Sequence, residues 1–195
     1  AYLIRLHALR DEVDDLNILA QTYATVAARR SSEPLVRGLA VQLYAEVERA
    51  RGHLNKSAAM LEPLGFLQRY WVVGSFDNEG KAGCGTDFGP EGAALSLEAT
   101  YPAKGKEVGW RKLDTVALDG YTDLSTVVRP NSEAVAYALG FLETSEEGRA
   151  NLSLGASGAF RVWVNGALAL SEDRYNLPRP DQARVSVKLR KGLIR

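Results

Sequence analysis

The chain has 195 residues, of which 46% are hydrophobic, and its 24 basic and 24 acidic residues give a formal net charge of +0. This length suits one or two domains, and the composition is that of a globular protein that can bury a core. Nucleic-acid binding draws most of its affinity from basic residues on phosphates, so the balanced charge argues against nucleic acid as a partner.

Neither membrane insertion nor a multi-cysteine site is expected. The longest apolar run, Ala134–Leu142, is too short for a membrane span, which takes roughly 20 residues as a helix. Cys84 is the single cysteine, so it cannot form an internal disulfide and leaves the redox compartment undetermined. The chain opens on residues that are typical of a helix interior, and we expect it to belong to a longer protein.

Residues 1–66 carry the period of helices. Apolar or small residues recur at steps of three and four from Tyr2 to Ala27 and again from Val36 to Leu61, which places each series on one helix face. The stretch Ser31–Pro34 separates the two series. It is typical of a helix start, because it offers a serine cap and a proline in the first turn.

Two arrangements fit this helical pattern. One is a pair of long helices packed antiparallel across a short connection. The other breaks the helices at Asp14-Asp15 and at Gly52-His53, and its shorter helices resemble tetratricopeptide repeats, particularly over Arg49–Gly65. The sequence leaves both arrangements open.

After Pro63-Leu64-Gly65, which ends the helical pattern, the period changes to two. Runs of this period, separated by Gly, Asn and Pro, indicate an antiparallel β-sandwich, and Asn165-Gly166 between two of them predicts a type I′ hairpin. The expected strands span 70–76, 94–101, 133–144, 150–155, 160–165, 167–172 and 183–189. We therefore predict an α+β chain, with a helical segment over 1–66 and a sandwich over 67–195.

The second segment carries a family resemblance. The stretch Phe160–Leu170 (FRVWVNGALAL) resembles a strand–turn–strand of galactose-binding-like jelly rolls, the sugar-binding domains attached to many glycoside hydrolases. Val185–Leu193 is similar to a later strand of these domains, although Ile194 stands where asparagine is expected. Trp71–Asn78 resembles the opening of such domains in large bacterial extracytoplasmic proteins. The resemblance covers residues 70–195 and implies a jelly roll, a carbohydrate ligand and a periplasmic or secreted location.

No catalytic constellation is visible in the sequence. Nucleophilic catalysis of the Ser-His or Cys-His kind needs a histidine near the nucleophile, and His7 and His53 both lie in the helical segment. The glycines around Cys84 match neither of the phosphate-binding loop patterns. We therefore expect a protein that is not an enzyme.

Aromatic and basic residues in the expected loops are the candidates for ligand binding. Exposed aromatic rings stack on sugar faces or anchor protein interfaces, and arginines beside them add hydrogen-bond donors. The candidate ligand-binding residues are Trp110, Tyr121, Arg174, Tyr175 and Arg179.

A cluster of carboxylates follows the first expected strand. Oxygen-rich loops can hold calcium, so Asp77, Glu79 and Asp87, with Glu91 nearby, are candidate ligands of a structural calcium ion. The spacing is not that of an EF-hand. Apart from this ion, no cofactor is expected.

The sequence thus predicts a non-catalytic binding module, for carbohydrate, within a larger extracytoplasmic protein. Two alternatives stay open. In one, the helices present a groove to a protein partner and the sandwich is structural. In the other, the chain is an accessory part of an enzyme whose catalytic domain lies outside it.

Overall fold

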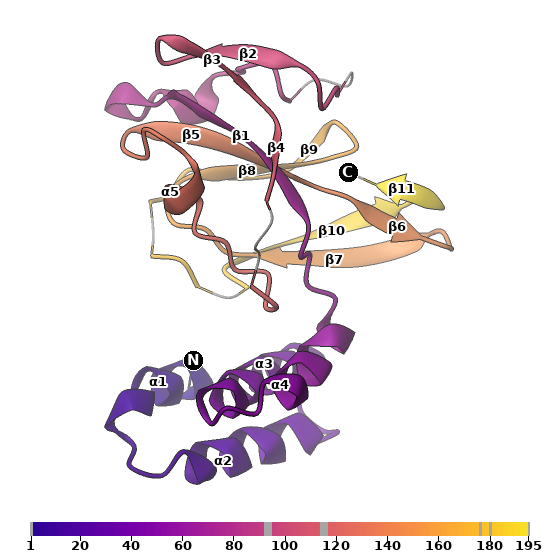
Figure 1. The fold of residues 1–195 in the computed structure, drawn as a ribbon. Helices are drawn as coiled ribbons and strands as arrows, with labels where there is room; N and C mark the ends of the chain where they lie inside the picture. The colour runs from indigo at the N-terminus through magenta and orange to yellow at the C-terminus, as the bar shows by residue number, and fades with distance from the viewer. Residues whose placement is uncertain (1, 92–94, 114–116, 176, 180, 195) are drawn as a thin grey trace. The chain divides into compact units, whose positions relative to one another are not determined.

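The computed structural model of the chain describes residues 2–91, 95–113, 117–175, 177–179 and 181–194. These residues form two compact units (Figure 1). The first unit contains the residues up to Gln68 together with the segment 117–121, and the second contains the rest. The boundary predicted from the sequence, after residue 66, lies close to this division, but the segment 117–121 was not expected to belong to the helical part.

The first unit is helical, and it has the arrangement with broken helices. Its α-helices are α1 (Tyr2–Ala8), α2 (Leu16–Ala28), α3 (Pro34–Ala50) and α4 (Leu54–Leu61). Helix α2 begins after Asp15, whose carboxylate accepts a hydrogen bond from the Asn17 N–H at 2.8 Å. Helix α3 ends before Gly52, which adopts a left-handed φ of +83°. Local capping therefore overrides the continuous apolar period of the sequence.

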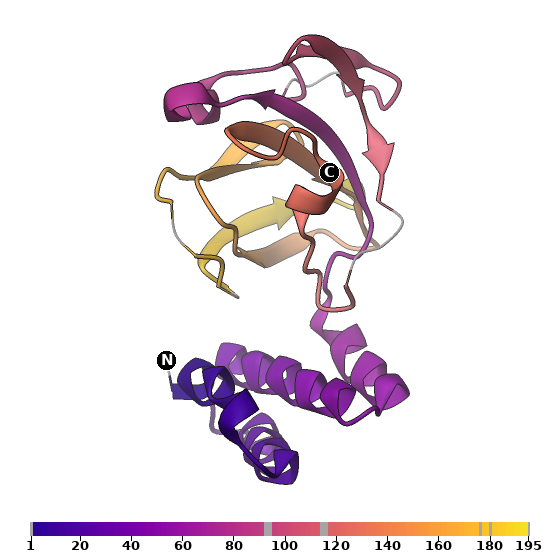
Figure 2. The ribbon, with the colours of Figure 1, turned by 60° about the vertical axis from the view of Figure 1, so that its left-hand side comes forward.

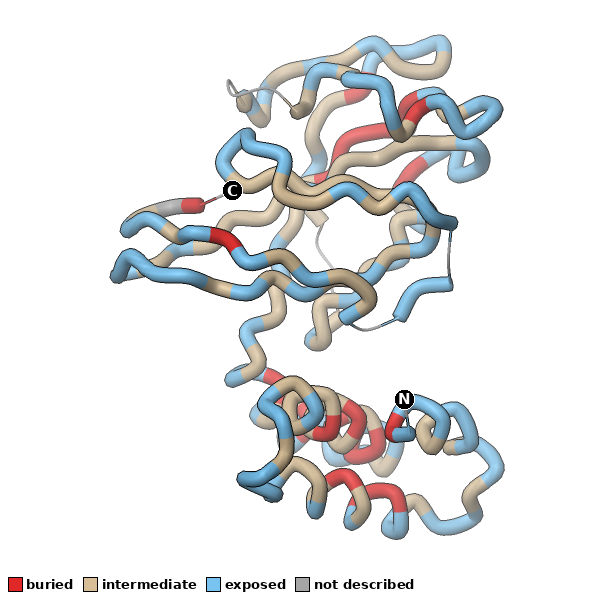
Figure 3. Tube along the Cα trace, turned by 180° about the vertical axis from the view of Figure 1, so that it is seen from behind, coloured by how far each residue is buried: buried red, intermediate tan, exposed pale blue. Residues whose placement is uncertain are grey.

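The core of the first unit lies between α2 and α3. Ala20 and Tyr23 of α2 are buried together with Ala40, Leu43 and Val47 of α3, as the apolar period predicts, and Leu19, which is outside the predicted series, is buried with them. Figure 3 shows the buried segments of these helices in red. No helix in the described part of the chain has the length and apolar character to cross a membrane.

The second unit consists mainly of antiparallel strands. They are β1 (Tyr70–Asp77), β2 (Thr100–Ala103), β3 (Lys106–Gly109), β4 (Arg111–Lys112), β5 (Ala134–Gly140), β6 (Leu142–Thr144), β7 (Gly148–Leu154), β8 (Phe160–Val164), β9 (Ala167–Glu172), β10 (Ala183–Leu189) and β11 (Gly192–Ile194). A short helix, α5 (Leu124–Val127), precedes β5. The chain therefore combines helices with antiparallel sheets, which is the α+β class that the sequence predicts.

The strands pair in several small sheets. Strand β1 lies at the centre of a three-stranded sheet in the order β4-β1-β5, and the remaining pairs are β2-β3, β6-β11, β7-β10 and β8-β9. The β7-β10 pair lies on the opposite side of β5 from the β2-β3 hairpin (Figures 1 and 2). Aromatic side chains fill the core next to β1, where Phe76 stacks on Phe88 with ring centroids 4.8 Å apart.

The hairpin prediction is confirmed, and two strand predictions need correction. Asn165 and Gly166 have φ values of +52° and +81°, and Val164 pairs with Ala167 across the turn. The strand expected over 133–144 is divided into β5 and β6, which belong to different sheets. The strand expected over 94–101 begins only at Thr100. Residues 95–99 are not a strand because Ser96–Ala99 closes a turn, whereas Ala94 lies outside the described residues. The short strands β3, β4 and β11 were not predicted.

Candidate ligand-binding cleft

An open cleft of about 550 Å³ lies in the second unit, where four loops and strand ends meet. Loops that are held in fixed positions by a scaffold of strands are common binding sites. The lining residues are Asn78, Gly80 and Lys81 after β1, Asn131, Glu133 and Ala134 before and in β5, Ser157 and Gly158 between β7 and β8, and Tyr175 after β9. We refer to this hollow as the cleft.

Asn78 joins two walls of the cleft. Its N–H donates to the Glu133 carbonyl at 3.0 Å, and its side-chain oxygen accepts from the Gly83 N–H at 3.0 Å. The Lys104 ammonium donates to the same Glu133 carbonyl at 2.7 Å. Gly83 packs closely against β5, and a β-carbon at this position would lie 2.9 Å from Val135 Cγ2. Only glycine therefore lets this loop approach β5.

Two residues of the cleft have a backbone conformation that is unusual for their type. Four non-glycine residues of the described chain have positive φ, and two of them, Asn165 and Asp181, are types that tolerate it. The other two are Lys81, with φ of +66°, and Glu133, with φ of +46°. For such side chains the left-handed conformation costs about 1–2 kcal/mol, and residues under this strain concentrate at functional sites.

Hydrogen bonds hold both strained residues in place. The Lys81 N–H donates to the Asn78 carbonyl at 2.9 Å, and the Glu133 carbonyl accepts from both Asn78 and Lys104. Lys81 and Glu133 are thus both hydrogen-bonded to the backbone of Asn78. These bonds hold the backbones of both residues at the cleft.

Tyr175 supplies an aromatic ring to the cleft. Its side chain is 47% exposed, and the Lys81 ammonium nitrogen lies 4.6 Å from the ring centroid. Gly158, with φ of +97°, faces the ring so closely that a β-carbon there would contact it at 3.5 Å. A cation over an exposed ring contributes only about 0.5–1 kcal/mol, so a ligand can replace this contact.

Most other charges near the cleft are neutralised by partners. The hydrogen bond from Lys104 lowers the pKa of Asp77, and the two groups lie 3.1 Å apart. Likewise, hydrogen bonds from Arg174 lower the pKa of Glu172, with the guanidinium 2.9 Å from the carboxylate. Within the described residues, neither Lys81 nor Glu133 forms an ion pair. The cleft therefore presents one cation and one anion that are free to meet a ligand.

The structure separates the five residues that the sequence nominates for ligand binding. Tyr175 lines the cleft, and Arg174 is next to it but engaged with Glu172. The side chain of Arg179 is exposed, and its backbone carbonyl lies against Gly155. These three residues share one connection, between β9 and β10.

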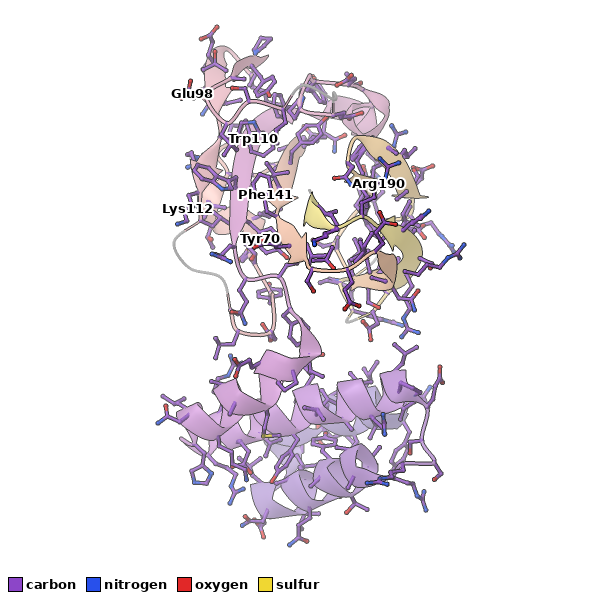
Figure 4. All side chains as sticks on the ribbon, turned by 90° about the vertical axis from the view of Figure 1, so that its right-hand side faces the viewer. Tyr70, Glu98, Trp110, Lys112, Phe141 and Arg190 are labelled. Carbon is purple, nitrogen blue, oxygen red and sulfur yellow. The ribbon has the colours of Figure 1, made fainter. Side chains whose placement is uncertain are left out.

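The other two nominated residues lie elsewhere. Trp110 is half-buried beside β1, where it packs on the aromatic core and its indole N–H donates to the Tyr101 hydroxyl at 3.4 Å (Figure 4). Tyr121 is 61% exposed and belongs to the segment 117–121 of the first unit. Neither residue lines the cleft.

The candidate calcium ligands do not gather into a site. No group of three or more His, Cys, Asp or Glu side chains in the described part of the chain is placed to hold a metal ion. Asp77 pairs with Lys104, and Asp87 accepts a hydrogen bond from the Gly89 N–H at 2.7 Å, so these two carboxylates serve turns. Glu79 is exposed in the loop after β1.

Sequence reasoning missed Asn78, Lys81, Asn131, Glu133 and Ser157 as lining residues. Asn78 and Asn131 precede turns, which is a weak signal for side chains that organise loops. Lys81 and Glu133 give no such signal, because lysine and glutamate are not turn residues. Glu133 is placed by a hydrogen bond from Asn78, which is distant in the sequence, whereas Lys81 is placed by a local bond to the same residue.

Comparison of the chain with protein-family models, with curated proteins and with solved structures found no match.

Proposed function

We propose that the second unit is a non-catalytic carbohydrate-binding module of the galactose-binding-like jelly-roll type, and that it binds sugar in the cleft beside Tyr175. The proposal combines the resemblance of the FRVWVNGALAL hairpin with the geometry of the cleft. The module would act within a larger extracytoplasmic protein. The single observation that carries it is the half-exposed Tyr175 ring at an open cleft that asparagine and serine residues also line.

The chemistry of the lining favours a hydroxyl-rich ligand. Pockets for apolar small molecules are enclosed and lined mainly by hydrophobic side chains. This cleft is open, and Asn78, Asn131 and Ser157 line it. The Asn78 side-chain oxygen already accepts from Gly83, and the Asn131 amide nitrogen already donates to Ser125. The Asn78 amide nitrogen as a donor, the Asn131 amide oxygen as an acceptor and the Ser157 hydroxyl as both suit sugar hydroxyls. The apolar face of a sugar ring would stack on Tyr175.

The same lining argues for binding without catalysis. Glycoside hydrolysis uses two carboxyl groups that face each other across the bond that is cleaved. Among the described residues that line the cleft, Glu133 is the single carboxylate. The two histidines, His7 and His53, lie in the first unit. No general base is therefore paired with a nucleophile in the cleft.

A glycan array followed by titration calorimetry tests the proposal. We expect the chain to bind a subset of oligosaccharides, and we expect Tyr175→Ala to weaken that binding at least tenfold. An aromatic anchor at the centre of a contact contributes about 2 kcal/mol, which is more than a factor of ten in affinity.

Tyr121→Ala is the matched control, because it removes an equally large exposed ring outside the cleft. It should leave affinity unchanged. An array on which the wild-type chain binds no glycan would refute the proposal and direct attention to the helical unit as a protein-binding surface. Equal losses from both variants would place the sugar elsewhere.

A further inference from the structure

The cleft contains a cation and an anion that are both set in strained backbone and are not paired with each other. Lys81 and Glu133 are the two described residues that adopt positive φ although their types disfavour it, and both line the same cleft. Strain of this kind persists only where the surrounding structure enforces it. Here the enforcing contacts are the hydrogen bonds through Asn78.

Both residues line the same open cleft, and within the described structure they do not form an ion pair with each other. An ammonium group is a donor only, and an ionised carboxylate is an acceptor only. A hydroxyl group can satisfy either one, since it both donates and accepts. Two adjacent hydroxyls can therefore satisfy both charges together.

We infer that Lys81 and Glu133 recognise a vicinal diol of an uncharged saccharide, and that Glu133 excludes acidic sugars. One hydroxyl oxygen accepts a hydrogen bond from the Lys81 ammonium, while the neighbouring hydroxyl donates to the Glu133 carboxylate. This inference rests on the proposed sugar-binding function and adds its ligand class. The cation and the anion balance, so the cleft has no net charge with which to attract a charged ligand.

Tyr175 fixes where the diol must lie. The Lys81 ammonium sits over the ring of Tyr175 before a ligand binds, 4.6 Å from the ring centroid. A sugar that stacks on the Tyr175 ring thus meets the Lys81 ammonium at the edge of the sugar ring, which carries the hydroxyl groups. The sugar loses little by displacing the cation from an exposed ring, because that contact is weak.

The test compares neutral hexose oligosaccharides with the uronic-acid oligosaccharides that differ from them only by a carboxylate at C6. We expect the wild-type chain to prefer the neutral members. Lys81→Met should weaken neutral binding about tenfold, because a hydrogen bond from a charged donor is lost. Glu133→Gln should shift the preference toward the acidic members by roughly fivefold or more, because removing the anion removes like-charge repulsion.

The matched controls are Lys112→Met and Glu98→Gln, which remove the same charges at exposed positions that do not line the cleft (Figure 4). Neither should alter the preference. Lys81→Gly separates folding from binding, because glycine relieves the strained φ while it removes the ammonium. We expect this variant to melt at a higher temperature than the wild type and yet to bind neutral sugar more weakly.

The outcomes distinguish this inference from the proposed function. If Tyr175→Ala abolishes binding but Lys81→Met and Glu133→Gln leave the preference unchanged, the diol inference is overturned and the sugar site stands. A wild-type preference for the acidic members would also overturn it. If the wild-type chain binds neither class, both ideas fail.

Discussion

Glu48 links helices α3 and α4, and its replacement tests how the first unit is stabilised. Its side chain is fully buried, and its carboxylate oxygens lie 2.7 Å from Arg51, 2.6 Å from His53 and 3.2 Å from Lys56. The last two partners stand at the start of α4 and within it. One buried acid therefore holds three basic groups around the break between the helices.

The expected cost of Glu48→Gln follows from the exposure of those partners. Removing one member of a buried ion pair costs about 3–5 kcal/mol when the other stays buried without a partner. Here the side chains of Arg51, His53 and Lys56 are 28%, 50% and 50% exposed, so water can solvate them after the substitution. The loss is then closer to that of one charge-assisted hydrogen bond, about 2 kcal/mol. For a unit of this size, that lowers the melting temperature by about 10 °C.

Thermal unfolding followed by far-ultraviolet circular dichroism measures this change, because the longer helices belong to the first unit. Glu46→Gln is the matched control on the same helix, since Glu46 contacts His7 at 2.8 Å and has no second basic partner in the described chain. We expect its melting temperature to fall by less than half as much. Equal shifts for the two variants would refute the view that the three contacts of Glu48 act together.

Two further predictions concern the pH dependence of the first unit and the glycine behind the cleft. Burial opposes ionisation of Glu48, but hydrogen bonds from His53 and Lys56 outweigh it and hold its pKa below the ordinary value of 4.5. The ionised acid therefore stabilises the fold above about pH 4.5 and loses this effect as the pH falls through its lowered pKa. The difference in melting temperature between wild type and Glu48→Gln should shrink on acidification, and a constant difference would contradict this. Gly83→Ala should lower the melting temperature of the second unit and weaken the proposed sugar binding, because the added β-carbon collides with the Asp77 carbonyl and with Val135. Gly85→Ala meets open space and should change neither quantity.

The helical half shows what periodicity can and cannot predict. The apolar series from Tyr2 to Ala27 identifies the face that packs against α3, and Ala20 and Tyr23 of this series are indeed buried there. The same series runs across Asp15 without interruption, yet the chain breaks there because the Asp15 side chain caps α2. Apolar spacing reports on burial, whereas helix ends depend on single polar residues.

The strand half was predictable where turns are local. Asn165-Gly166 specifies its hairpin through two neighbouring residues that tolerate positive φ, so the sequence alone was sufficient. The short strand β4 was missed because it pairs with a distant part of the chain, as Lys112 does with Trp71. Strand β3 pairs locally with β2 across Lys104-Gly105, so its shortness and not a distant partner is what hid it. Their sequences carry too few alternating residues to register as strands.

The cleft combines residues whose role is visible in the local sequence with residues that are placed by contacts between separate segments. Only the first kind could be predicted. Tyr175 was nominated because an aromatic residue in a loop is visible in any sequence. Lys81 and Glu133 have residue types that usually face solvent, and what sets them apart is their backbone conformation. That conformation is imposed by Asn78, which donates to the Glu133 carbonyl and accepts from the Lys81 N–H. A strained pair that is held by a third residue leaves no trace in composition or spacing, so the residues that would select the ligand become visible only when the two loops are seen together.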